Sequence, residues 1–185
     1  MILEQYKKRL HFWTYPGLYI PYWTRSDIMK KIVSLGDCVI SDNVDDILVS
    51  FALASCVALT VYSPSRKVLG MVHIVLPDSS LGPDDASSNP GYYADTAVPA
   101  LLYDICSSYR CCLNELVVRI YGGADSINYN DVFLIGKRNI TAVAGILNSN
   151  MIPFFGDETR GSVSRTVEID VATGRARVEV QPIRI

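Results

Sequence analysis

The chain has 185 residues, of which 49% are hydrophobic and 19% are charged, and its mean hydropathy is +0.20. This length and composition are typical of one folded domain and exclude a disordered chain, which would be poor in apolar residues. The net charge of -2 and the pI near 5.6 give no general attraction to phosphate backbones, so nucleic acid is a poor candidate partner.

The opening segment, residues 1–33, is rich in aromatic side chains. It has no apolar h-region followed by a small-residue cleavage site, so we expect no signal peptide. Aromatic side chains at this density usually pack onto something, because each carries a large apolar area. We interpret the segment as an extension that covers part of the core, with a contact surface for a partner as the alternative. The remaining residues, 34–185, are predicted to be the main domain.

The five cysteines are an odd number, and none of them forms a CxxC pair. Without an export signal, the expected environment is a reducing cytoplasm in which the thiols are free. The spacing of Cys106, Cys111 and Cys112 does not match a zinc site, so we expect neither a metal nor another cofactor. No apolar run is long and uninterrupted enough for a membrane span, and membrane insertion is not expected.

The stretch from residue 46 to residue 77 is predicted to contain three strands. DILVSFALA (46–54) and CVALTVY (56–62) are the first two, SPSRK (63–67) is a turn, and VLGMVHIVLP (68–77) is the third strand. The polar, Gly- and Pro-rich stretch that follows, 78–92, is predicted to be a long loop.

The second half of the chain is predicted to alternate helices and strands. Asp95 is expected to cap one helix, and Asn139 to cap a second helix over residues 140–149. ELVVRIYGG (115–123) is a predicted strand between them, and the tail, 164–183, has the alternation of a β-hairpin around an Ala-Thr-Gly turn. The whole chain therefore reads as one mixed α/β domain with much antiparallel pairing.

One of the two histidines, His73, lies in an apolar run seventeen residues after Cys56. If Pro64 and Ser65 are the central residues of the intervening turn, partners in the hairpin have numbers that sum to 129. Cys56 and His73 would then face each other directly, with Cβ atoms ~5 Å apart. Ser50 ends the preceding strand and could bring its hydroxyl or its carbonyl close to His73.

A cysteine beside a histidine has a chemical use. Imidazole can take the thiol proton, and the thiolate is the nucleophile. A third group is generally needed to fix the tautomer and orientation of the ring. The alternative is that Cys56 is a small buried hydrophobe and His73 a core residue held by one backbone hydrogen bond. Spacing alone does not decide between the two.

Several motifs in this order resemble the CheD family, the chemoreceptor glutamine deamidases of bacterial and archaeal chemotaxis. SFALASCVA (50–58) is similar to the family's Thr-Leu-Gly-Leu-Gly-Ser-Cys-Val-Ala, and LGMVH (69–73) to its Gly-Gly-Met-Ala-His. Further matches are YADTAVP (93–99), GGA (122–124) and IGKRNI (135–140). The resemblance covers roughly residues 34–180, and the ordered set is far more specific than any single motif.

This resemblance implies a layered α/β sandwich and a cysteine hydrolase that converts receptor glutamine to glutamate with release of ammonia. It implies that Cys56 is the nucleophile and that His73 is the general base and then the acid. Ser50 would replace the family's threonine as the orienting residue, and Ser55 would contact substrate. The implied partners are methyl-accepting receptors and the phosphatase CheC, and some members are linked to receptor methylester hydrolysis.

The chain also departs from the family pattern beside the nucleophile, where Ala52 and Ala54 replace two glycines. Glycine there could serve a positive φ or a close approach of substrate, and alanine would obstruct either. The departures motivate an alternative, a catalytically weak CheD-like adaptor that binds receptors or CheC. A third reading, a toxin-like deamidase acting on another protein, fits the downstream motifs less well.

Overall fold

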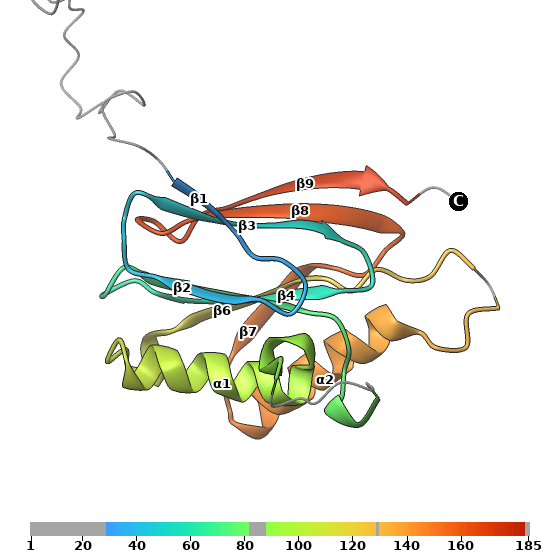
Figure 1. Cartoon of the computed structure of the whole chain (residues 1–185), viewed down its shortest axis with the longest axis horizontal. Coiled ribbons are helices and arrows are strands. Elements are labelled where there is room, and N and C mark those ends of the chain that lie inside the picture. Colours follow the sequence, from blue (N-terminus) through green and yellow to red (C-terminus); the bar gives the residue numbers. More distant parts are fainter. Residues whose placement is uncertain (1–28, 82–87, 129, 184–185) are drawn as a thin grey trace, which may run out of the picture.

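The computed structural model describes residues 29–81, 88–128 and 130–183, and within them two β-sheets and a layer of helices stack as three layers (Figure 1). The outer sheet has the strand order β1-β3-β8-β9, and the middle sheet has the order β2-β5-β4-β6-β7. Helices α1 and α2 cover the face of the middle sheet that is turned away from the outer sheet. A mixed α/β fold with largely antiparallel pairing was predicted, and the structure confirms it.

The outer sheet is buried on one face only. It consists of β1 (Met29–Ile32), β3 (Asp46–Leu53), β8 (Val163–Asp170) and β9 (Ala176–Pro182). β1 pairs parallel with β3, whereas the β3–β8 and β8–β9 pairs are antiparallel. Buried and half-buried residues alternate along β8, as expected for a strand with one face toward the core.

The middle sheet is buried on both faces around its central strands. It consists of β2 (Cys38–Ser41), β4 (Val57–Ser63), β5 (Val68–Ile74), β6 (Val117–Gly122) and β7 (Phe154–Thr159). Every residue of β4 and β5 is buried, which explains their nearly continuous apolar sequences. One apolar cluster fills the space between the two sheets, and another lies between the middle sheet and the helices.

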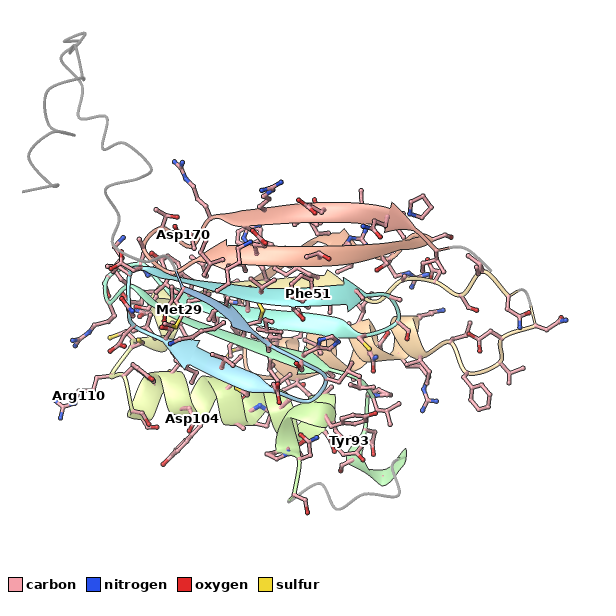
Figure 2. All side chains as sticks on the ribbon, turned by 45° about the horizontal axis from the view of Figure 1, so that its top comes forward. Met29, Phe51, Tyr93, Asp104, Arg110 and Asp170 are labelled. Atoms are coloured by element: carbon pink, nitrogen blue, oxygen red, sulfur yellow. The ribbon has the colours of Figure 1, made fainter. Side chains whose placement is uncertain are left out.

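The helical layer contains α1 (Ala94–Ser107) and α2 (Ile135–Ser149). In the part of the chain that the structure describes, three short 3₁₀ helices span Ser79–Leu81, Pro90–Tyr92 and Leu113–Glu115. The view in Figure 2 shows α1 running from the neighbourhood of Tyr93 to that of Arg110. Among the described residues, no helix is long and apolar enough to cross a membrane.

Residues 29–33, which the sequence analysis placed in the N-terminal extension, are part of the folded sheet. Met29–Ile32 forms β1 beside β3, and Val33 is buried in the cluster between the sheets. The rest of the predicted extension, residues 1–28, lies outside the described residues.

The predicted register of the β4–β5 hairpin is wrong by two positions. His73 pairs with Ala58, and Val57 pairs with Ile74, so that partner numbers sum to 131 and Cys56 does not face His73 directly. The loop has four residues between the pair Ser63 and Val68, and its last residue, Lys67, has a φ of 55°. Four- and five-residue loops are a common hairpin class, and this one replaces the expected two-residue turn.

Candidate active site

Ser50 and His73 meet across the two sheets. Ser50 lies on β3 of the outer sheet and His73 on β5 of the middle sheet, and Ser50 Oγ is 2.9 Å from His73 Nδ1. Both residues are buried, with His73 only 3% exposed. The predicted proximity of the Ser50 hydroxyl to His73 is therefore confirmed, although the roles of the two residues stay predictions.

The hydrogen bonds of Ser50 fix the tautomer of His73. Ser50 Oγ also lies 3.2 Å from the carbonyl oxygen of Val33, which can only accept a hydrogen bond. A serine hydroxyl has one proton, so Ser50 donates to Val33 and accepts from His73 Nδ1–H. The lone pair of the ring is then on Nε2, which is buried and has no hydrogen-bond partner among the described residues. An imidazole held at Nδ1 with a free Nε2 is the arrangement that a general base requires.

Cys56 lies in the bend that leads into β4, with its backbone held by the residues after β6. The Gly123 amide donates to the Cys56 carbonyl at 2.8 Å, and the Ala124 amide donates to the Ala54 carbonyl at 2.7 Å. A side chain at Gly122 would collide with the Cys56 carbonyl, so glycine is required there for this close approach. Residues 54–56, called the nucleophile loop because they hold the predicted nucleophile, are thus fixed by backbone contacts.

The Cys56 and His73 side chains both enter the space between the two sheets. Cys56 packs against the apolar cluster there, and His73 reaches Ser50 of the facing sheet through the same space. Ala58 faces His73 on the neighbouring strand. Position 56 comes two residues earlier, and a residue there on the same strand face would lie diagonally opposite His73, ~7–8 Å away between Cα atoms. Nothing hydrogen-bonds to His73 Nε2 in the described part of the chain. Catalytic hydrogen bonds are often long before substrate binds.

Burial keeps both groups neutral in the resting structure. Burial raises the pKa of the Cys56 thiol, and its own backbone amide opposes that shift only in part. Burial also lowers the pKa of His73, against the opposing effects of the Val33 carbonyl and the negative charge of Asp37. Desolvation disfavours the charged form of each group. The resting pair is therefore thiol and imidazole, and an ion pair has to form when substrate approaches.

Two cavities flank the pair. One, of about 340 Å³, is lined by His73 together with Phe51 and Ala52 of β3 and residues 32–35. Figure 2 shows Phe51 on the outer sheet. The other cavity, of about 250 Å³, is lined by Ala54 and Ser55 of the nucleophile loop and by residues from 124–136 and Ile183. Ser55, the predicted substrate contact, thus borders a cavity, but no observation tests that role. No cluster of three metal-ligating side chains occurs among the described residues.

The two alanines beside the nucleophile have different backbones. Ala52 has a φ of 55°, in the left-handed region that glycine adopts without strain, whereas Ala54 is absent from the residues with positive φ. The sequence argument that a glycine at this point would serve a positive φ therefore applies to position 52. Position 52 lies at the register shift of β3 between Ser50 and Leu53, and the backbone takes this conformation there even with alanine.

Asn139 contacts the backbone beside the candidate site, which the sequence did not predict. It was predicted to cap a helix, but α2 begins at Ile135, and Asn139 lies inside it with no exposed surface. Its Nδ2 donates to the carbonyls of Ser55 at 3.0 Å and Val75 at 2.9 Å. The sequence feature that could have indicated a buried role is the spacing: Asn139 is a polar residue in line with Val143 and Leu147, on the buried stripe of the helix.

Comparisons with known proteins show which family the chain resembles. The family model described as CheD chemotactic sensory transduction matches residues 75–180. A protein of Syntrophus aciditrophicus named "Probable chemoreceptor glutamine deamidase CheD 1" is 39% identical over 148 residues, which cover 80% of this chain and 92% of that protein. The "Chemoreceptor glutamine deamidase CheD" of Thermotoga maritima is 35% identical over 150 residues, covering 81% and 91% of the two chains.

The solved structure of YlmD from Geobacillus stearothermophilus matches 70% of this chain and 59% of its own, with a TM-score of 0.40 and 10% sequence identity. This similarity is too low to support an argument. The family model and the relatives are sufficient without it. The model matches more than half of the chain, and the relatives align with about four fifths of it at 35–39% identity. This chain belongs to the CheD family.

Proposed function

We propose that this chain is a chemoreceptor glutamine deamidase, which hydrolyses the side-chain amide of receptor glutamine to glutamate and releases ammonia. The names of its relatives support the reaction and the substrate. The observation that carries the proposal is the free Nε2 of His73, on a ring held at Nδ1 by Ser50, in the interlayer space that Cys56 also enters. A cysteine hydrolase needs such a base near its thiol.

In the first half of the proposed reaction, Cys56 Sγ loses its proton to His73 Nε2 and attacks the carboxamide carbon. The resulting imidazolium is stabilised at Nδ1 by Ser50, which passes part of the charge to the Val33 carbonyl. His73 then returns the proton to the departing nitrogen. The C–N bond breaks, ammonia leaves, and a thioester to Cys56 remains.

In the second half, His73 Nε2 takes a proton from a water molecule, and the water oxygen attacks the thioester carbon. The C–S bond breaks, the sulfur recovers its proton from His73, and the side chain leaves as a carboxylic acid, which releases its remaining proton to solvent and becomes a carboxylate. The receptor gains one negative charge and a site that can be methylated. The same steps could also hydrolyse a receptor methylester.

The flanking cavities suggest where substrate enters. We infer that the target side chain approaches along the nucleophile loop, where Ser55 borders one cavity and His73 the other. All five cysteines are free thiols, which supports the cytoplasm as the place of action, on the cytoplasmic part of the receptors. We further propose a CheC-type phosphatase as a second partner.

The test is incubation of the full chain with a purified cytoplasmic fragment of a methyl-accepting receptor. Ammonia release is followed in solution, and mass spectrometry locates each glutamine that has become glutamate. The wild type and Cys112→Ala, which changes an exposed cysteine outside the site, are expected to convert the fragment. Cys56→Ala and His73→Gln are expected to leave it unchanged.

The same experiment separates the deamidase from a CheD-like adaptor. An adaptor would bind the fragment but convert no glutamine, and Cys56→Ala would behave like the wild type. Conversion that persists in Cys56→Ala would exclude the proposed nucleophile, while binding without conversion by the wild type would exclude the deamidase.

A further inference from the structure

The buried amide of Asn139 joins the nucleophile to the strand that carries the base. Its Nδ2 donates one hydrogen bond to the carbonyl of Ser55, the residue before Cys56. Its second proton goes to the carbonyl of Val75, two residues after His73. Because Asn139 belongs to α2, the helical layer reaches past the edge of the β4–β5 hairpin to hold both backbones at one point.

The hairpin does not make this connection by itself. The last ladder pair is Val57 with Ile74. Beyond it, Ser55 (two residues before Val57) and Val75 (one residue after Ile74) both present carbonyl oxygens to the same amide. Two carbonyls cannot bond to each other, whereas an NH₂ group with two donors can bridge them. The amide therefore extends the coupling of the two strands beyond their last pair and into the nucleophile loop.

We infer that Asn139 is a positioning residue of the proposed deamidase, which sets the Cys56 thiol relative to His73 Nε2. This inference rests on the proposed function for its reaction, but not for its geometry. A role in packing alone explains the side chain poorly, since Oδ1 of Asn139 is buried without a hydrogen-bond partner. Such a group is costly, and a well-packed apolar residue would avoid the cost. The two donors on Nδ2 are what the position uses.

The test replaces Asn139 with an isosteric residue that lacks the two donors. In Asn139→Asp, a carboxylate oxygen faces the two carbonyls and repels them. The matched control is Asn150→Asp, because Asn150 is exposed at the end of the same helix and its Nδ2 donates only to Ile146. Asn139→Ser, which is uncharged and keeps one donor on a shorter side chain, serves as the second variant.

Three quantities are measured on the full chain. The first is thermal unfolding. The second is the rate at which iodoacetamide alkylates Cys56 across pH, with Cys56 distinguished from the other cysteines by peptide mass spectrometry. The third is the pair of kinetic constants kcat and KM for a receptor fragment. We expect Asn139→Asp to lower kcat by a factor on the order of a hundredfold with KM little changed. The pH profile of Cys56 alkylation is expected to shift in the folded variant. Asn150→Asp should match the wild type in alkylation and in kcat and KM, and should lose only a little thermal stability, because its carboxylate lies at the C-terminal end of α2.

The inference is overturned if Asn139→Asp folds and keeps the wild-type alkylation profile and kcat. If Asn139→Asp does not fold, Asn139→Ser decides by the same criteria, and failure of both variants to fold would assign Asn139 a purely structural role. Alkylation of Cys56 needs no receptor. A wild type that converts no glutamine would therefore refute the proposed function, while the alkylation profiles would still decide whether Asn139 positions the thiol.

Discussion

The Ser50 hydroxyl lies between one group that accepts a hydrogen bond from it and another that donates one to it. The Val33 carbonyl can only accept a hydrogen bond, and His73 Nδ1 then has to donate one. A threonine would have the same hydroxyl with a methyl group that restricts its rotamer. In this chain the buried surroundings restrict Ser50 instead, since its side chain is inaccessible to solvent. The rotamer of Ser50, the proposed orienting residue, is therefore set by its neighbours rather than by its own branching.

The pKa shifts of the pair predict a broad pH optimum for deamidation. In the proposed mechanism turnover requires neutral His73, and burial lowers its pKa, so the acid limb should lie below the ordinary histidine pKa of about 6.5. Burial raises the pKa of the Cys56 thiol, so the sulfur keeps the proton that it passes to His73 until the pH exceeds the ordinary range of thiol pKa values. The expected profile of kcat/KM is flat between these limits. It is measured with the receptor fragment in overlapping buffers.

A suitable comparison for this profile is Ser50→Ala, which removes the hydroxyl that holds Nδ1. We expect turnover to fall in this variant because the ring loses its fixed tautomer. A wild-type acid limb well above pH 6.5 would contradict the neutral-pair mechanism, since it would require an imidazole that charges more readily than in water.

Ala52 and Ala54 predict opposite effects of the same substitution on stability. Ala52→Gly relieves a left-handed conformation that costs alanine about 1–2 kcal/mol, although glycine also gains about 0.4–1 kcal/mol of unfolded-state entropy. The free energy of unfolding should therefore rise by roughly 0–1.6 kcal/mol. Ala54→Gly has no positive φ to relieve and should lower it by about 0.5–1 kcal/mol. Urea unfolding measures both, and a shift of the same sign in both variants would refute the argument.

Among the elements, the strands were the most predictable. The apolar runs predicted three strands between residues 46 and 77, and β3, β4 and β5 occupy that stretch. The pairing between β4 and β5 was wrong because it depends on the loop, where Lys67 takes a left-handed conformation that no local signal requires. A shift of two keeps the side-chain alternation, so Cys56 and His73 stayed on the same face.

Both helices begin earlier than their polar residues indicated. α1 starts at Ala94, and Asp95 in its first turn accepts hydrogen bonds from the backbone and hydroxyl of Ser79. α2 starts at Ile135, and Asn139 uses its amide on Ser55 and Val75. Asp and Asn are good caps because their side chains bond to backbone groups. In both helices the side chain bonds to a distant segment instead, which the local sequence does not reveal.

The site could be predicted only where it is local in sequence. Cys56, His73 and Ser50 lie within 24 residues of one another, and spacing and family resemblance found them. Val33 and Asn139 enter through β1–β3 pairing and helix packing, which need the assembled layers. The sequence carries their residue types but no indication of which distant carbonyls and hydroxyls they meet.

Over the whole molecule, each of the three layers contributes to the site. Ser50 comes from the outer sheet, and Val33 directly follows β1 of that sheet. His73 comes from the middle sheet, whose strand β4 begins directly after the Cys56 bend. The helical layer supplies Asn139. The geometry of the thiol and its base thus depends on the distance between layers, and above all on how closely α2 approaches the segment 122–124.

Two glycines of α2 provide a test of that approach. Alanine is a better helix former than glycine by about 0.8–1 kcal/mol, so both Gly136→Ala and Gly145→Ala would stabilise an isolated helix. At Gly145 nothing lies within 4 Å of an added Cβ, and we expect a gain of up to about 1 kcal/mol.

At Gly136 an added Cβ would collide with the backbone carbonyl of Ala124, so α2 has to move away from the residues that hold the nucleophile loop. Overpacking of this kind costs about 1–3 kcal/mol or more, which exceeds the gain in helix propensity. Gly136→Ala should therefore lower the free energy of unfolding and also reduce turnover, whereas Gly145→Ala should raise stability and leave turnover unchanged. Urea unfolding and the receptor-fragment assay measure the two effects. A stable, fully active Gly136→Ala would show that the site tolerates a wider spacing of its layers.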